Sequence, residues 1–242
     1  MGLLLQCSPV STNAPAEDGT PAKILLMTSL PIVWGDGASM ESILSGKTSP
    51  APIYDHWQQY YDIAAVDSFV GLESSDTDIV LLAQPPAMDP ADIAAIDAWV
   101  RAGGKVIILT DPMLVWPTAF PLGDKRRPLA SGLLSPLLSH WGLELQLPDQ
   151  AGSGEVELKF ADATIATIGI GTFKLMPEQK DGRADCALSV ANVMARCTIG
   201  QGAAIILADA DFLNDGFWTD QADQGEGDAR RLTDMFIADL KK

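Results

Sequence analysis

The sequence has few basic residues and no long hydrophobic run. Sixteen Lys and Arg residues stand against 32 Asp and Glu residues, which gives a formal charge of −16 and a pI near 4.3. A protein of this charge is repelled by phosphate backbones, so no nucleic-acid partner is expected. The longest apolar run has six residues, Ala203 to Ala208, whereas a transmembrane helix needs about 20. No membrane-spanning segment is therefore expected in this chain.

Cysteine and histidine are also scarce. The three cysteines, Cys7, Cys186 and Cys197, allow at most one disulfide and show no C-x-x-C spacing typical of zinc or redox sites. Cys186 and Cys197 lie in apolar, strand-like segments, which favours a buried structural role. The two histidines, His56 and His140, have no catalytic partner that their spacing identifies.

Motifs for nucleophiles and nucleotides are missing as well. No predicted strand ends in the G-x-S-x-G pattern of a nucleophile elbow. The segment Gly35-Asp36-Gly37 lacks the glycine spacing of phosphate-binding loops, and its carboxylate would repel a phosphate. We therefore expect no cofactor, and the sequence does not favour an enzyme.

A globular chain is nevertheless indicated, because 47% of its 242 residues are hydrophobic and 20% are charged. Residues 1–21 are expected to be a disordered leader, followed by one α/β domain over residues 22–242. The first seven residues look like the end of a lipoprotein signal, but three leucines without a basic stretch cannot act as one. The alternative is that the sequence is a piece of a longer chain.

Residues 78–110 predict a βαβ unit. Ile79 to Ala83 is an apolar strand, and Asp89-Pro90 offers an N-cap and a first helical residue. Gly103-Gly104 ends the helix, and Lys105 to Thr110 is the second strand. A strand, a crossover helix and a strand within about 33 residues require parallel pairing.

Other segments extend this pattern to a mostly parallel, three-layer α/β fold. Strands are expected at 23–28 and 63–66, and helices at 39–44, at 229–240 and after a cap at Ser135. Alternating segments at 155–160, 164–168 and 172–175 predict an antiparallel β-rich extension around residues 152–200. Residues 193–208 predict a hairpin with a three-residue turn, Gly200-Gln201-Gly202, whose second arm returns to the sheet.

Polar and aromatic residues follow several predicted strands, at the sheet edge where α/β proteins bind ligands. The candidate ligand-binding residues are Trp34, Asp36, Asp111, Trp116, Asp209 and Asp211. The carboxylates could hold Ca²⁺ or Mg²⁺, or each could accept hydrogen bonds from the next turn. The tryptophans could line a cleft or simply pack. No catalytic residue and no definite metal ligand set is assigned.

Three stretches together resemble a known family. These are the end of the βαβ unit, "WVRAGGKVIILTDPM", then "LLSPLLSHWGLEL" at 133–145 and "IGQGAAIILADADFLND" at 199–215. They resemble the extracytoplasmic domain of gliding-motility-type auxiliary components of ABC transporters, the uncharacterised ABC-type transport system family. The resemblance implies a flavodoxin-like, class I glutamine amidotransferase-like sandwich without the amidotransferase cysteine. It also implies permease and ATPase subunits as partners.

We therefore expect a non-catalytic accessory or binding domain of an ABC-type transport system. The alternative is a hydrolase or sugar-processing enzyme that uses the Asp and Trp residues of the sheet edge, with or without a divalent cation. The expected location is periplasmic or membrane-associated, with the cytoplasm as the alternative.

Overall fold

The computed structural model describes residues 20–148, 155–177, 184–218 and 229–242 of the chain. The expected leader 1–21, except its last two residues, and Cys7 lie outside this part. None of the helices in the described ranges has the length and apolar character that crossing a membrane requires.

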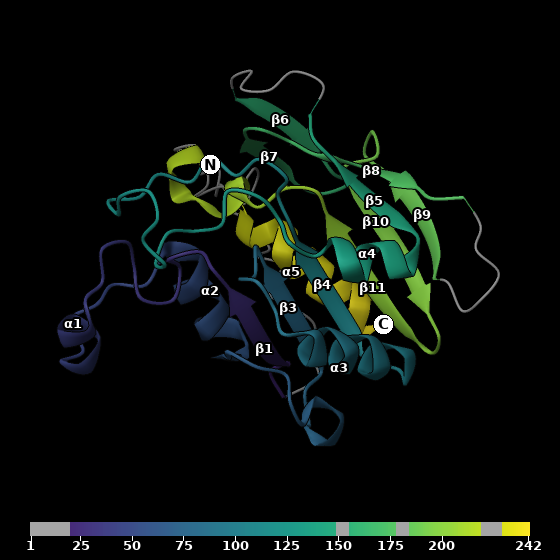
Figure 1. The fold of residues 1–242 in the computed structure, drawn as a ribbon, viewed down its shortest axis with the longest axis horizontal. Helices are drawn as coiled ribbons and strands as arrows, with labels where there is room; N and C mark the ends of the chain where they lie inside the picture. Colours follow the sequence, from purple (N-terminus) through teal and green to yellow (C-terminus); the bar gives the residue numbers. More distant parts are fainter. Residues whose placement is uncertain (1–19, 149–154, 178–183, 219–228) are drawn as a thin grey trace, which may run out of the picture.

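A seven-stranded sheet forms the centre of the fold (Figure 1). Its order is β2-β1-β3-β4-β11-β10-β9, in which the first five strands are parallel and the last two add antiparallel pairs. In this order the strands are Asp62–Ala65, Lys23–Thr28, Ile79–Ala83, Lys105–Leu109, Gly202–Leu207, Met194–Ile199 and Asp185–Ser189. The mostly parallel sheet that the βαβ pattern predicts is confirmed.

Burial follows the position of each strand in the sheet. All five residues of β3 are buried, and β4 and β11 are nearly as enclosed, as their continuous apolar sequences predict. By contrast, β2 at the sheet edge is short and mostly exposed. The buried apolar residues of the described chain form one continuous hydrophobic cluster.

Helix α3, Pro90–Arg101, joins β3 to β4 as the βαβ pattern predicts. Its N-cap Asp89 accepts a hydrogen bond from the backbone N–H of Ala91, and Ile96 and Val100 are fully buried against the sheet. Helix α4, Ser135–Trp141, is tied to α3 because the indole N–H of Trp141 donates to Asp97 at 2.7 Å.

Two further helices cover the other face of the sheet. Helices α2, Pro52–Tyr60, and α5, Ala229–Lys241, are joined by a buried hydrogen bond of 3.0 Å from Trp57 Nε1 to Thr233 Oγ1. Figure 1 shows α5 behind the sheet, with α3 and α4 in front of it. The short helix α1, Met40–Leu44, projects away from the sheet and has no buried residue.

The three predicted antiparallel segments do form strands, but together with a fourth strand, β5, they lie outside the central sheet. Strand β5, Leu143–Gln146, pairs with β8, Thr172–Leu175, and β6, Val156–Lys159, pairs with β7, Thr164–Thr167. Each pair is a separate two-stranded sheet. Three 3₁₀ turns complete the described elements: η1 Leu72–Ser74, η2 Asp211–Leu213 and η3 Asp215–Phe217.

Two local predictions are wrong. The β10–β11 turn has two residues rather than three, because Gly202 pairs with Ile199. Gly200 has a positive φ of 61°, and an added Cβ would lie 2.5 Å from the carbonyl oxygen of Arg101. Helix α4 is capped by Leu134 rather than Ser135, because Leu134 is buried and its carbonyl already accepts the helical bond from Leu138.

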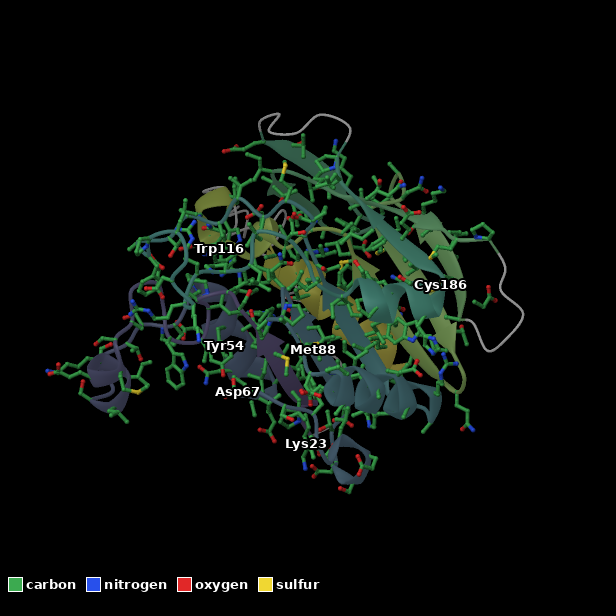
Figure 2. All side chains as sticks on the ribbon, viewed as in Figure 1. Lys23, Tyr54, Asp67, Met88, Trp116 and Cys186 are labelled. Carbon is green, nitrogen blue, oxygen red and sulfur yellow. A yellow bond between two sulfur atoms is a disulfide. The ribbon has the colours of Figure 1, made fainter. Side chains whose placement is uncertain are left out.

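Cys186 and Cys197 face each other across the β9–β10 pair and form a disulfide. The two sulfur atoms join directly opposed residues of neighbouring strands. Figure 2 places Cys186 on β9, on the opposite side of the molecule from Trp116. The disulfide therefore cross-links β9 and β10 at the antiparallel edge of the central sheet.

Candidate functional site

Sheet topology brings three aspartates together. Strands β4 and β11 are parallel neighbours, and the N–H of Thr110 donates to the carbonyl of Leu207 at 3.0 Å just beyond their last pair. The chain leaves both strands at the same edge of the sheet. Asp111 follows β4 closely, and Asp209 and Asp211 follow β11.

The three carboxylates form a buried cluster. Asp111, Asp209 and Asp211 each have 0% of their surface exposed. One carboxylate oxygen from each residue lies within 4.8 Å of the corresponding oxygens of the other two. The cluster is therefore sealed from solvent rather than displayed on the rim of a cleft.

Each aspartate also accepts a hydrogen bond from a backbone amide in a loop. Asp111 Oδ1 accepts from the N–H of Met113 at 2.7 Å, and Asp211 Oδ2 accepts from the N–H of Val115 at 2.7 Å. Asp209 Oδ1 accepts from the N–H of Asp211 at 3.0 Å. The sequence suggests either a group of neighbouring carboxylates or separate hydrogen bonds from each aspartate to the next turn. In the structure both occur together.

The hydrogen-bond donors around the cluster do not satisfy every carboxylate oxygen. Asp209 Oδ1 also accepts from the hydroxyl of Thr167 at 2.9 Å. Asp209 Oδ2 and Asp211 Oδ1 are buried and accept no hydrogen bond from any described residue. The salt bridges found between described residues involve none of the three aspartates.

Burial of the cluster favours its protonated forms. Burial raises the pKa of Asp111 to about 6, although the N–H of Met113 opposes the shift. Burial also raises the pKa of Asp211 to about 7, and the neighbouring charge of Asp111 adds to this. The pKa of Asp209 is raised well above its usual value by burial and then by the charge of Asp111.

The other candidate residues lie on loops at this edge. Asp36 accepts hydrogen bonds of 3.0 Å from the hydroxyl of Thr118 and the N–H of Ala119, so it joins the loop after β1 to the loop after β4. Trp34 is half-exposed at 50%. Trp116, labelled in Figure 2, is partly buried against the hydrophobic core. The two tryptophans and Asp36 do not enter the buried carboxylate cluster.

Gln84 fixes the loops at this edge, although no pattern in the sequence predicts a role for it. It follows β3 directly, is fully buried and has a positive φ of 44°. Its side chain accepts from the N–H of Asp111 at 2.8 Å and donates to the carbonyls of Asp111 and Leu129 at 3.1 and 2.9 Å. Glutamine is not a usual left-handed residue, so no sequence rule signals this conformation.

His56 finds a partner that its sequence spacing could not reveal. Its Nε2 lies 2.9 Å from Asp234 Oδ2, and the hydroxyl of Tyr61 donates to Asp234 Oδ1 at 2.7 Å. The contact joins α2 to α5 across 178 positions of the sequence. None of these three side chains hydrogen-bonds to the buried carboxylate cluster.

A hollow of about 500 Å³ opens at the opposite end of the parallel strands. Ile79 and Lys105, the first residues of β3 and β4, contribute to its wall, together with Trp99 of α3 and Lys241 of α5. The hollow is therefore separate from the buried carboxylate cluster at the carboxyl ends of β4 and β11.

Comparison with known proteins identifies one family. A family model described as "ABC-type uncharacterized transport system" matches residues 8–148, more than half of the chain. This match confirms the family suggested by the three sequence stretches. No curated protein sequence matches at a significant level.

Several solved structures show a limited structural likeness to this chain. They include exo-beta-1,4-mannosidase Op5Man5 from Opitutaceae bacterium strain TAV5, with 12% identity, a TM-score of 0.48 and coverage of 91% of this chain and 36% of that chain. The beta-galactosidase from Rahnella sp. R3 has 15% identity, a TM-score of 0.44 and coverage of 85% and 31%. The cytoplasmic protein STM3548 from Salmonella typhimurium has 11% identity, a TM-score of 0.44 and coverage of 91% and 98%. This chain spans about a third of the two glycosidases, and these likenesses carry no functional argument.

Proposed function

Since this chain belongs to the ABC-type uncharacterized transport system family, we propose that it is a non-catalytic accessory or binding domain of such a transport system. The match over residues 8–148 is the observation that carries the proposal. Its partners would be the ATPase and permease subunits of the transporter. The domain would dock with them rather than transform a substrate.

The chemistry of the sheet edge supports a non-catalytic role. A nucleophile elbow carries a serine on a strained turn that leaves a strand, but the left-handed residue after β3 is Gln84, whose side chain forms three hydrogen bonds to the backbone. General acid or base catalysis requires contact with the substrate, yet Asp111, Asp209 and Asp211 have no exposed surface. The hydrolase or sugar-processing alternative is therefore not favoured.

We further propose that residues 22–242 form one domain with a flavodoxin-like arrangement. The five parallel strands occur in the order 2-1-3-4-5 when they are numbered along the chain among themselves, which is the order of flavodoxin-like folds. A single hydrophobic cluster that includes residues from Ala22 to Leu240 supports one domain. As part of the same proposal, the fold would also be similar to that of class I glutamine amidotransferases.

We also propose an extracytoplasmic location. The Cys186–Cys197 disulfide supports it, because structural disulfides persist in oxidising compartments and are rare in the cytosol. Treatment of intact cells and of lysates with a thiol-reactive probe, with and without prior reduction, tests this. If Cys186 and Cys197 react with the probe in intact cells without prior reduction, the cytoplasmic alternative would be favoured.

Co-purification tests the accessory role directly. The full chain, tagged and expressed in its native host, is cross-linked in cells and recovered from solubilised membranes, with an equally tagged unrelated protein of the same compartment as the control. We expect mass spectrometry to find one ATPase and one permease of an ABC transporter with this chain and not with the control. Recovery of the chain without either subunit would contradict the proposal.

An activity assay addresses the alternative. The purified chain is incubated with nitrophenyl glycosides and nitrophenyl esters, beside the variant Asp111→Asn. We expect neither protein to release nitrophenol above the buffer rate. Turnover that the substitution removes would establish the hydrolase alternative.

A further inference from the structure

The buried carboxylate cluster lacks a counter-charge within the described chain. Asp209 and Asp211 have no exposed surface, and each has one carboxylate oxygen without any hydrogen-bond partner. Buried polar atoms are nearly always satisfied by a partner, and buried charges are paired or bind a metal. Two fully buried, unpartnered oxygens beside a third carboxylate therefore require a positive partner, which is either a bound cation or a proton on the cluster.

Hydrogen bonds from the backbone hold the three carboxylates in fixed orientations, as outer contacts do for metal ligands. In each of the three residues one oxygen accepts a hydrogen bond from a loop amide, which holds the carboxylate plane in place. Asp209 is held further by the hydroxyl of Thr167. Such outer contacts fix the ligating groups of metal sites. Within the described residues, Asp209 Oδ2 and Asp211 Oδ1 accept no hydrogen bond, whereas Asp111 Oδ2 accepts one from the N–H of Ala210 at 3.4 Å.

The chemistry of the cluster selects a hard cation. Its three residues offer carboxylate oxygens, and no His or Cys of the described ranges belongs to the cluster. Oxygen ligands suit Ca²⁺ and Mg²⁺, whereas nitrogen and sulfur ligands suit zinc and copper. Ca²⁺ accepts irregular oxygen coordination, whereas Mg²⁺ requires a near-ideal octahedron and usually keeps several waters, which a cluster closed to solvent does not favour.

We propose that Asp111, Asp209 and Asp211 bind one divalent cation, preferentially Ca²⁺, at the carboxyl ends of β4 and β11. The site goes beyond the accessory role and does not depend on it. The cation would be structural, because the cluster is closed to solvent. It would join the loop after β4, which contains Asp111, to the segment after β11, which contains Asp209 and Asp211. The hydrogen bond from the N–H of Val115 to Asp211 already links these two segments.

Metal content and thermal stability test the site. The protein is stripped with EDTA, dialysed against metal-free buffer and measured with CaCl₂ or MgCl₂ at millimolar concentration. We expect one Ca²⁺ per chain by elemental mass spectrometry after desalting. We also expect the melting temperature to rise by about 5–10 °C when Ca²⁺ is a hundredfold above its Kd.

Variants show whether the bound ion uses these residues. Asp209→Asn and Asp211→Asn remove ligand charge with little change in size and are expected to abolish the calcium-dependent rise. Asp215→Asn is the matched control, because Asp215 is an exposed acid four residues after Asp211 and should keep the full rise. Circular dichroism in EDTA checks that each variant folds.

Each remaining outcome is decisive. Absence of bound Ca²⁺ in the wild-type protein would overturn the proposal even if a variant fails to fold. A larger effect of Mg²⁺ than of Ca²⁺ would overturn the preference for calcium. A rise that persists in both cluster variants would show that Ca²⁺ binds elsewhere and would also overturn the site.

Discussion

Gln84 Oε1 accepts a hydrogen bond of 2.8 Å from the backbone N–H of Asp111, which links the carboxyl ends of β3 and β4. The same side chain donates to the carbonyl of Asp111 at 3.1 Å, so it bonds both polar groups of one peptide residue. Gln84 does this from a left-handed backbone conformation with φ of 44°. The position of Asp111, and through it the buried carboxylate cluster, therefore depends on a residue of the neighbouring strand end.

Substitution of Gln84 should separate the cost of its lost hydrogen bonds from the strain of its backbone. Gln84→Ala leaves buried backbone groups of Asp111 and Leu129 without partners, and we expect a loss of about 2–4 kcal/mol in the free energy of unfolding. Gln84→Gly loses the same bonds but adopts a positive φ without strain, so it should be more stable than the alanine variant by about 1 kcal/mol. Urea unfolding measures both. Equal stability of the two variants would contradict strain at this position.

Two buried threonines of the site should respond in opposite ways to valine. The hydroxyl of Thr110 is buried and has no hydrogen-bond partner among the described residues, so Thr110→Val should stabilise the protein by about 1 kcal/mol. The hydroxyl of Thr167 donates to Asp209 at 2.9 Å, so Thr167→Val should destabilise it by about 1–3 kcal/mol. Chemical unfolding of both variants under the same conditions tests the pair. A loss of stability in Thr110→Val would show that its hydroxyl has a partner in solution.

The Cys186–Cys197 disulfide should contribute measurably to stability. It closes a loop between residues 11 positions apart, and reduction should lower the free energy of unfolding by about 3 kcal/mol. Thermal unfolding with and without a phosphine reductant measures the change. The double variant Cys186→Ala/Cys197→Ala should start from the lower value and show no response to the reductant. A response of that variant would point to another target of the reductant.

The metal-free protein should become more stable as the pH falls from 8 to 5.5. Burial raises the pKa of Asp211 to about 7 and that of Asp111 to about 6, whereas both titrate near 3.9 in the unfolded chain. Between these values the folded state holds more protons than the unfolded state, so its stability falls as the pH rises. We expect a difference of about 2 kcal/mol over this range in EDTA.

The variant Asp211→Asn provides the control for this pH dependence. It removes the acid with the pKa near 7, so the stability of the metal-free variant should depend less on pH between 8 and 5.5. Unfolding curves at matched ionic strength measure both slopes. A wild-type stability that is constant, or that rises with pH, would contradict protonation of the buried carboxylate cluster.

Much of the fold could be predicted because its signals are local. The run Ile79–Ala83, the Asp89-Pro90 start of α3 and the strand from Lys105 are each encoded by neighbouring residues, and the structure has them at nearly the predicted bounds. Where a boundary is set by tertiary contacts, the prediction is off by one residue. The cap of α4 at the buried Leu134 is an example.

The candidate site could be predicted only in part. Asp111, Asp209 and Asp211 stand out because each follows an apolar strand, and parallel pairing brings such residues to one edge. Their burial could not be predicted, since it depends on loops that fold back over the sheet. The contacts of Gln84 and of His56 with Asp234 join positions far apart in the sequence, and no spacing rule connects them.

By itself the sequence determined most of the strands and helices and the parallel βαβ unit, because hydrophobic periodicity and capping residues act over a few neighbouring positions. Helix α2, Pro52–Tyr60, was not among its predictions. The sequence also determined the acidic charge and the family. Only the tertiary structure decided that β11 lies beside β4, that Cys186 faces Cys197 and that three carboxylates are enclosed together. These features depend on which distant segments pack against each other, and that choice is made by the burial of the whole core.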